Sequence, residues 1–183
     1  FLRITGVGQK KLLDFGATIR FEDLAPGPLV RGGVSITWQP VRHPQGCVSY
    51  RLATPERTVI IATDCEHEGQ TQDAALIEFC RGADVLLHDA QYTPEEFPQR
   101  RGWGHSTWEH GVRLAEAAGV KQLVLVSHDP GRCDEDVDRL VRNARAVFPQ
   151  TMGAAEQMAL DGKDLPSVEL PSESPSRGTT LGP

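Results

Sequence analysis

Short apolar runs alternate with longer amphipathic stretches along most of the chain. Residues 18–21 and 34–38 alternate apolar and polar side chains, which is typical of half-buried strands. Residues 47–53 and 58–62 have the composition of an antiparallel pair, and the Thr-Pro-Glu-Arg sequence at 54–57 predicts the turn between them. The pattern therefore predicts that the first third of the protein is mostly β-structure.

The remaining sequence predicts strands that alternate with helices. Thr71, Ser106 and Asp134 are the expected N-caps, and Ser106 opens a predicted capping box. Together the patterns predict an α/β domain (layered, α+β) whose helices cover an outer face of a mixed sheet. The predicted helices cover 71–81, 106–118 and 134–148, and the predicted strands cover 85–88, 123–126 and a segment within 153–160.

Length and charge narrow the class of protein. A chain of 183 residues is sufficient for one domain with a substantial core. The net charge of −6 argues against a surface that binds nucleic acid or anionic lipid everywhere, although a local basic groove remains compatible with it. No apolar run approaches the roughly 18 residues that span a membrane. The four cysteines form no CxxC pair, so we expect reduced thiols and a cytoplasmic location.

The two ends of the sequence differ from its middle. The first residues lack the pattern of a signal peptide, and they include no initiator Met, so we expect a fragment or a processed product. Residues 161–183 contain four prolines and four serines with little to bury. We therefore predict a folded domain over 1–160 and a disordered tail over 161–183.

The residues that could bind a metal or take part in catalysis are concentrated at the ends of predicted strands. His43, Asp64, Asp89 and His128 each follow a predicted strand, and His105 directly precedes a predicted helix. In α/β sheets, ligands gather outside the carboxyl ends of strands. Imidazole and carboxylate groups suit zinc or manganese, and a carboxylate can bridge two ions. These positions indicate a divalent-metal site at one edge of the sheet.

Each of these residues also has a purely structural interpretation. His43 stands in a His-Pro-Gln-Gly turn, and the aspartates could close their own loops. His67 and His110 are predicted at the surface, and His88 within the core. The sequence contains no local HxH or HExxH pair. From the residues alone, a metal hydrolase and a non-catalytic α/β domain both remain open.

Several strings, in their order along residues 17–160, resemble the metallo-β-lactamase-fold hydrolases, and the ribonuclease Z-like and cyclic-phosphodiesterase-like branch is the most similar. The resemblance implies an αββα sandwich with two metals at one edge of its sheets. The strings are HPQG (43–46), ATD (62–64), LHDAQYT (87–93), GWGHST (102–107) and VSHDP (126–130).

The resemblance also implies a role for each candidate residue. His43 would bind the first metal, Asp64 would bridge both metals, and His128 would bind the second. His105 would protonate the leaving oxygen, and Asp89 would orient His105. The implied cofactor is Zn²⁺, two ions in the family and one or none here, with Mn²⁺ as an alternative.

One family signature is absent from the sequence. The HxHxDH motif supplies most of the metal ligands in these hydrolases, yet no histidine precedes His43. Residues 11–16 look like the family strand that comes before this motif, so we expect the sandwich to be incomplete in its N-terminal half. Alternatively, residues 1–16 are unrelated sequence or the region just after the motif. The resemblance therefore implies that the hydrolase activity of this chain is impaired, unless another chain supplies the histidines of the HxHxDH motif.

The expected substrate is a phosphodiester, either the 3′ end of RNA or a small cyclic phosphate. The sequence has no Lys/Gly-rich arm of the kind that holds tRNA, so a small phosphodiester is favoured. Arg100 and Arg101 beside Trp103 could contact a phosphate or a base. A non-catalytic interaction domain is the alternative, with a homodimer formed through exposed strand edges. A lactone or thioester hydrolase of the same fold is a third interpretation.

Overall fold

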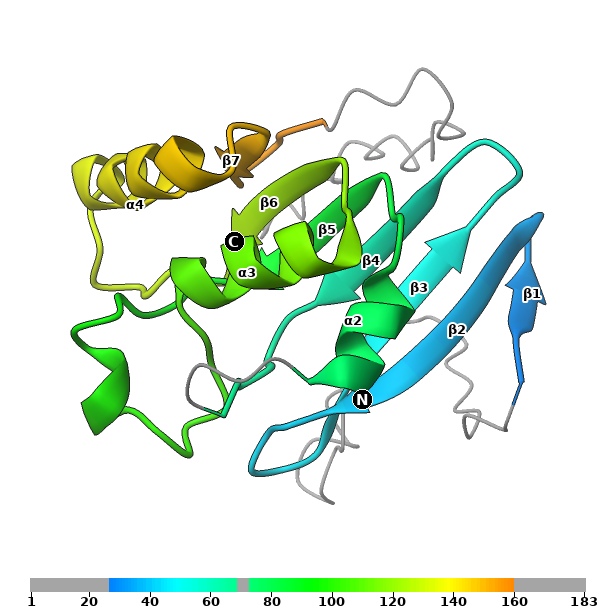
Figure 1. Cartoon of the computed structure of the whole chain (residues 1–183), viewed down its shortest axis with the longest axis horizontal. Coiled ribbons are helices and arrows are strands. Elements are labelled where there is room, and N and C mark those ends of the chain that lie inside the picture. Colours follow the sequence, from blue (N-terminus) through cyan, green and yellow to red (C-terminus); the bar gives the residue numbers. More distant parts are fainter. Residues whose placement is uncertain (1–26, 69–72, 160–183) are drawn as a thin grey trace, which may run out of the picture.

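The computed structural model describes residues 27–68 and 73–159. In this part of the chain, seven strands form one mixed sheet, and their spatial order follows their order in the sequence (Figure 1). The strands are β1 (Leu29–Arg31), β2 (Val34–Val41), β3 (Cys47–Ala53), β4 (Thr58–Ala62), β5 (Val85–Asp89), β6 (Gln122–Val126) and β7 (Thr151–Gly153).

Strands β1 to β4 pair antiparallel, and β4 to β7 pair parallel. The predicted hairpin between β3 and β4 is confirmed: Thr54 N–H donates to Arg57 O at 2.8 Å, and Thr54 Oγ1 accepts from Arg57 N–H at 3.0 Å. In the parallel part, Ala62 is opposite His88, and Asp89 is opposite Val126. The carboxyl ends of β4, β5 and β6 therefore meet at one edge of the sheet.

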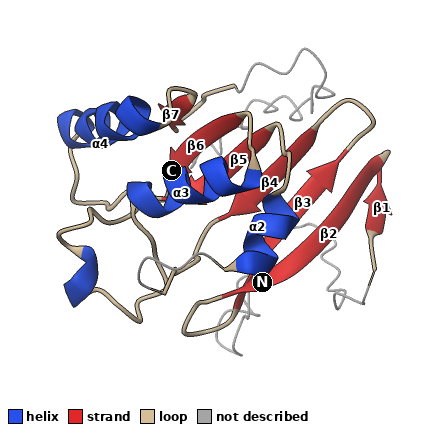
Figure 2. Ribbon diagram, viewed as in Figure 1, coloured by secondary structure: helices blue, strands red, loops and turns tan. Residues whose placement is uncertain are grey.

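Among the described residues, three α-helices lie on one face of this sheet (Figures 1 and 2). They are α2 (Ala74–Cys80), α3 (Trp108–Ala118) and α4 (Asp134–Val147), and a 3₁₀ turn, η1 (Phe97–Gln99), lies in the connection from β5 to α3. The core forms between helices and sheet, where Leu114 of α3 and Leu86 and Leu123 of the strands are fully buried. Removal of this apolar surface from water is the main force that holds the layers together.

The opposite face of the sheet is also apolar. Arg51 donates to Phe79 O of α2, so its side chain is on the helical face, and its strand neighbour Tyr50 points to the other face. The register aligns Tyr50 with Trp38, Ile61 and Leu87 across the sheet. None of the helices described covers this apolar row, which is consistent with the expected incomplete sandwich.

Several predicted boundaries shift in the structure. Helix α2 begins at Ala74, where Asp73 is the N-cap, whereas Thr71 lies outside the described residues. The N-cap of α3 is Thr107, and the prediction of Ser106 is wrong because the Ser106 hydroxyl donates to Cys65 O instead. Cys133, and not Asp134, is the N-cap of α4, and β7 begins at Thr151 because it pairs with Leu123–Leu125. The predicted strand at 18–21 and the tail at 161–183 lie outside the described residues.

Two further expectations concern the environment of the protein. Among the described residues, no helix is long and apolar enough to cross a membrane. All four cysteines are free thiols, and two of them, Cys65 and Cys80, are buried.

Candidate active site

Two strand ends turn sharply at the edge of the sheet where the candidate residues lie. Asp64 follows β4 with φ of 50°, and Ser127 follows β6 with φ of 57°. A residue other than glycine in this left-handed region carries a conformational cost, which the surrounding structure has to offset. Such turns change the direction of the side chains that follow a strand, and strained positions of this kind gather at functional sites.

Three side chains converge at this edge, and we call them the edge site: His43, Asp64 and His105. Each offers one ligand atom, and these atoms all lie within 4.8 Å of one another. All three residues are partly exposed, so solvent and a ligand can reach the group. The structure thus brings together two of the predicted metal ligands and the predicted acid.

Glycine at position 104 allows the His43 ring to occupy its place. Gly104 has φ of +90°, and a Cβ added there would lie 2.1 Å from His43 Cδ2 and 2.6 Å from Nε2. The buried Glu66 carboxylate holds this loop, because it accepts hydrogen bonds from the N–H groups of Gly102 at 2.8 Å and Gly104 at 2.9 Å. Glu66 N–H in turn donates to Arg42 O, next to His43, at 2.9 Å. Glu66 therefore positions one wall of the edge site.

Asp89 is fully buried behind the edge site and joins three segments. Its carboxylate accepts from Asp64 N–H at 3.2 Å, Gln91 N–H at 3.2 Å and Ser106 N–H at 2.9 Å. A fourth bond comes from His105 Nδ1 at 2.7 Å. A buried carboxylate requires such donors, and here they fix the positions of the segments that carry Asp64 and His105.

The bond to Asp89 defines the state of His105. Since a carboxylate oxygen only accepts, Nδ1 of His105 carries a proton, and Nε2 is the nitrogen left for a reaction. The hydrogen bond that His105 donates to Asp89 raises the pKa of His105, although partial burial opposes the effect. This Asp–His pair is suited to hold and deliver a proton at Nε2.

His128 does not join the other two predicted ligands. It lies outside the edge-site group, and a Cβ added at Gly153 of β7 would be 3.9 Å from its Nε2. Both of its ring nitrogens are buried, and neither has a hydrogen-bond partner among the described residues. Burial lowers the pKa of His128, so the neutral form is favoured. A neutral imidazole with two buried, unpartnered nitrogens has the chemistry of a metal ligand.

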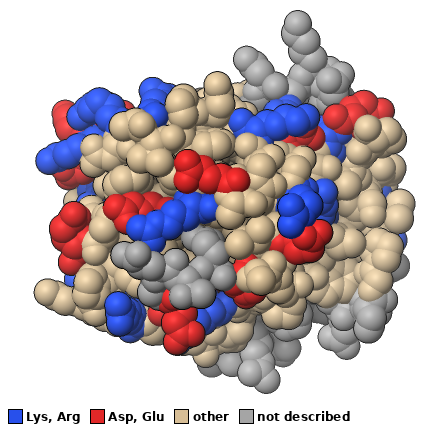
Figure 3. Space-filling model, viewed as in Figure 1, with Lys and Arg blue, Asp and Glu red and all other residues tan. Residues whose placement is uncertain are grey.

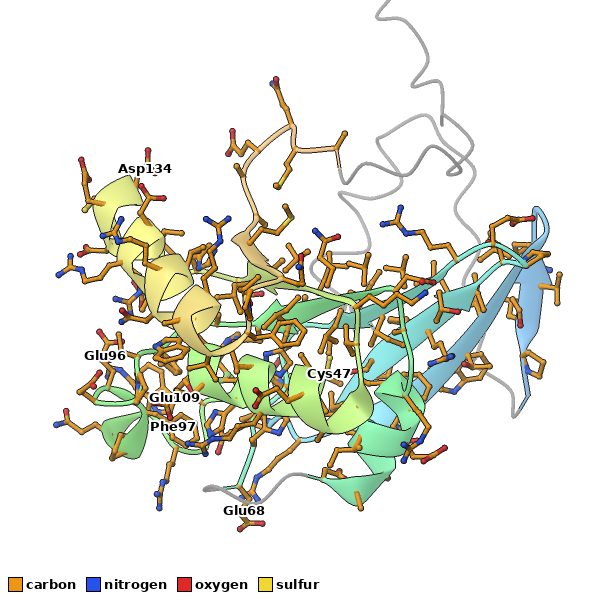
Figure 4. The ribbon with its side chains drawn as sticks, turned by 45° about the horizontal axis from the view of Figure 1, so that its top comes forward. Cys47, Glu68, Glu96, Phe97, Glu109 and Asp134 are labelled. Atoms are coloured by element: carbon orange, nitrogen blue, oxygen red, sulfur yellow. The ribbon has the colours of Figure 1, made fainter. Side chains whose placement is uncertain are left out.

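A second group, which we call the buried cluster, lies behind the edge site and contains Cys65, His67 and His88. Their ligand atoms also lie within 4.8 Å of one another, and all three residues are buried. The burial of His88 confirms its predicted core position, but the prediction that His67 and His110 lie at the surface is wrong. The His110 ring packs 5.2 Å from that of His67 and 4.9 Å from that of Phe97, which is labelled in Figure 4.

Burial also sets the protonation of this cluster. Desolvation, with a smaller contribution from His110, lowers the pKa of His67 to about 4, and desolvation lowers the pKa of His88 well below its usual value. Burial raises the pKa of the Cys65 thiol. All three groups are therefore neutral at pH 7 when nothing is bound.

Sequence reasoning missed Glu66, and it missed the pairing of Cys65 with His67. A signal was present, because Asp64, Cys65, Glu66 and His67 are four consecutive residues of ligand-forming types after a buried strand. Such a run indicates a metal-binding region more strongly than any one of its residues does. Because the chain turns here, its side chains can point to two different sides of the end of the strand.

The fold and the edge site define an α/β protein in which residues with metal-binding side chains lie at the ends of parallel strands. Residues 14–128 match the sequence model of a family described as "Beta-lactamase superfamily domain". The chain belongs to this family, with the metallo-β-lactamase fold and on its ribonuclease Z-like branch, as the motifs predicted.

Curated relatives support this assignment. The chain is 31% identical to ribonuclease Z from Brevibacillus brevis over 132 residues, which cover 68% of this chain and 40% of the relative. It is 30% identical to ribonuclease Z from Archaeoglobus fulgidus over 150 residues, which cover 75% of this chain and 44% of the relative. The chain thus spans less than half the length of these relatives.

Solved structures support the fold. The metallo-β-lactamase-fold protein YhfI from Bacillus subtilis has a TM-score of 0.63 at 22% identity, and the match covers 81% of this chain and 58% of that one. The short form of human tRNase Z has a TM-score of 0.53 at 19% identity, covering 71% of this chain and 44% of that one.

Proposed function

We propose that this chain contributes the edge site of a metal-dependent phosphodiester hydrolase. The observation that carries the proposal is the convergence of His43, Asp64 and His105, with His105 held by the buried Asp89. His43 and Asp64 would hold one divalent cation, and Asp64 and His128 are the proposed ligands of a second. His105 is the proposed acid.

The donors at the edge fit a divalent cation. Imidazole and carboxylate groups are ligands for zinc and manganese, and a catalytic site retains open coordination positions for water and substrate. The buried, unpartnered nitrogens of His128 support its role, because a ligand would satisfy them. When bound, the cation would supply Lewis acidity and an activated water.

The remaining chemistry belongs to His105 and Asp89. Asp89 holds the Nδ1 proton of His105, which leaves Nε2 to deliver a proton to the departing oxygen of the phosphodiester. The raised pKa of His105 increases the fraction of the protonated acid at neutral pH. Asp64 N–H also donates to Asp89, so the ligand and the acid share one buried anchor.

We expect low activity from the 183 residues alone. No histidine precedes His43 in this sequence, so the ligands that HxHxDH supplies in the family are not among its residues. With fewer protein ligands, each cation binds more weakly. Activity would then depend on high metal concentration or on a chain that brings the missing ligands.

The substrate is proposed to be a small phosphodiester, with an RNA 3′ end as the second candidate that the names of the relatives suggest. Acidic and basic side chains are interspersed on the face in Figure 3, with no broad basic surface there for nucleic acid. Trp103 is 58% exposed, and Arg100 stacks on its ring at 4.7 Å. This pair could hold one base or one phosphate of a small substrate.

The test compares His105→Gln with Glu109→Gln, a control on α3 outside the site. With excess Mn²⁺ or Zn²⁺, we expect the wild type to hydrolyse a nucleoside 2′,3′-cyclic phosphate slowly, because its alkoxide leaving group needs a proton, and His105→Gln to lose about 100-fold in kcat with unchanged metal content. A loss of bound metal in His105→Gln would make it a ligand and contradict its role as acid. No hydrolysis of this substrate or of 3′-extended RNA by a metal-loaded wild type would contradict the hydrolase proposal.

A non-catalytic interaction domain is the second proposal, and the apolar row around Trp38, Tyr50 and Ile61 favours it. Such a surface invites a partner or a second copy. Light scattering would show a concentration-dependent dimer in that case, and a strict monomer would contradict homodimerisation. The four free thiols support the expected reducing, cytoplasmic environment.

A further inference from the structure

We infer that Cys65, His67 and His88 form a second, structural metal site for zinc or a similarly thiophilic divalent cation. His88 Nε2 lies 2.9 Å from His67 Nε2 and 3.7 Å from Cys65 Sγ. Cysteine sulfur and imidazole nitrogen are both ligand types that bind zinc in proteins, and these three residues are at most 4% exposed. This inference is independent of the proposed hydrolase function, because the cluster shares no side chain with the edge site.

The tautomer of His88 prepares it for a cation. Its Nδ1 lies 2.6 Å from the backbone oxygen of Asp89, and because a carbonyl oxygen only accepts, Nδ1 carries the proton. The Nε2 lone pair of His88 therefore points toward His67 and Cys65. Metal-binding histidines are commonly fixed in this way, with the other ring N–H donated to a backbone carbonyl.

The distances are close to those around a zinc ion. Zinc bonds of about 2.0–2.1 Å to nitrogen and about 2.3 Å to sulfur place tetrahedral ligand atoms roughly 3.3–3.7 Å apart. The separation of Cys65 Sγ from His88 Nε2 already matches, at 3.7 Å. The two imidazoles, 2.9 Å apart, would separate by a few tenths of an ångström. The hydrogen bond that they share without a cation would then be replaced by two metal–nitrogen bonds.

The proton balance of binding is simple. Both imidazoles are neutral, so His67 only shifts its proton from Nε2 to Nδ1, and the Cys65 thiol releases its proton to solvent as the sulfur–metal bond forms. The Asp89 carboxylate lies close enough to act on this thiol electrostatically. Thiolate and carboxylate together reduce the cost of a buried dication.

A path to the cluster exists at the surface. A cavity of about 480 Å³ is lined by Cys65 and His67 together with Arg42 and Glu68. The Glu68 side chain points outward beside it (Figure 4) and pairs with Arg42 at 2.9 Å. A cation could enter through this cavity, and a water molecule from it could complete the coordination.

A cation bound in this cluster would stabilise the positions of the residues that form the edge site. Cys65 directly follows Asp64, and His88 directly precedes Asp89. The backbone oxygen of Cys65 also accepts from Ser106 Oγ at 2.5 Å, next to His105. Metal bonds to Cys65 and His88 would therefore link the ends of β4 and β5, next to Asp64 and to Asp89, the residue that holds His105.

The experiment is a Co²⁺ titration of the chelator-treated chain, followed by absorption. A thiolate–cobalt charge-transfer band reports a cysteine ligand, which the proposed edge ligands cannot give. We expect the band in the wild type and its loss in Cys65→Ser and His67→Leu. The controls Cys47→Ala, Cys80→Ala and Cys133→Ala should retain it, as should Asp64→Asn.

Zinc-dependent thermal stability provides the second readout. We expect Zn²⁺ to raise the melting temperature of the wild type and of Cys133→Ala, and to raise it less in Cys65→Ser, with circular dichroism confirming that each variant is folded. Absence of the charge-transfer band from the folded wild type, or a band that survives Cys65→Ser, would overturn the inference. A band lost in Cys47→Ala would also overturn it, because the thiol ligand would then be Cys47.

Discussion

The edge site and the buried cluster lie back to back at one strand edge, and they differ in chemistry. The edge site has a carboxylate and is partly exposed, with Asp64 49% and His105 20% exposed in their side chains. The buried cluster has no carboxylate and is almost completely covered. Adjacent residues connect the two groups: Asp64 of the edge site precedes Cys65 of the buried cluster, and His88 of the buried cluster precedes Asp89, which holds His105. One strand edge thus supports an accessible group and a shielded one.

The largest effect is expected when the anchor between the two groups is removed. Asp89→Ala would leave three backbone N–H groups and His105 Nδ1 without their acceptor, so we expect a loss of about 3–5 kcal/mol in the free energy of unfolding. Asp129→Ala, which removes a partly exposed aspartate whose carboxylate accepts from Gly131 N–H in a turn, should cost about 1 kcal/mol or less. Chemical denaturation of both variants would measure this, and equal losses would contradict the anchoring role of Asp89.

Acid should destabilise the protein through the buried cluster. The pKa of His67 is about 4 in the folded chain and about 6.5 unfolded, so the unfolded state binds more protons as the pH falls. Stability is complete above pH 6.5 and declines toward pH 4, by roughly 3 kcal/mol for His67 alone. Urea unfolding of the metal-free proteins across this range should show that the free energy of unfolding depends more steeply on pH in the wild type than in His67→Leu. The same slope in both proteins would be evidence against a buried, neutral His67.

Glycine substitutions can perturb the edge site selectively. Gly102 and Gly104 both have positive φ and both donate to Glu66, but only at Gly104 would a Cβ collide with His43. We expect Gly104→Ala to cost about 2 kcal/mol more than Gly102→Ala and to weaken Mn²⁺ binding, because the His43 ring must move. Chemical unfolding would compare the stabilities of the two variants, and Mn²⁺ titration would compare their affinities for the cation. Indistinguishable variants would show that the ring is not confined by Gly104.

The smallest effect is expected outside both groups. Glu109 pairs with Arg113 on α3 at 2.9 Å, and both side chains are about one third exposed. Such a pair contributes about 0.3–0.5 kcal/mol, so Glu109→Gln should change stability by less than about 1 kcal/mol and leave Co²⁺ binding unaffected. A larger loss in thermal or chemical unfolding would mean that the effects assigned to the two groups are not specific to them.

Local signals were sufficient to predict the hairpin and the strand ends. The runs of β3 and β4 on either side of the Thr-Pro-Glu-Arg turn identify that pair from sequence alone, and the apolar run of β6 identifies a buried strand. His43 and Asp64 were found because each follows such a run. The family resemblance, which covers the same motifs, is confirmed by the match over residues 14–128.

What sequence could not predict depends on contacts between distant segments. Ser106 and Thr107 are both good capping residues, and the Ser106 contact with Cys65, 41 residues away, leaves the cap to Thr107. His67 and His110 are polar, yet both are buried, and their rings pack against each other at a tilt of 37°. His128 follows its strand as predicted, but its ring lies near Gly153 of β7, outside the group that His43 and Asp64 form.

The most direct test of the edge site is a crystal structure of the chain grown with Mn²⁺, with the cation located by anomalous scattering. The account predicts an anomalous peak within bonding distance of His43 and Asp64, with His105 still hydrogen-bonded to Asp89. A well-ordered edge without a peak, at a concentration where Mn²⁺ binding in solution is saturated, would contradict it.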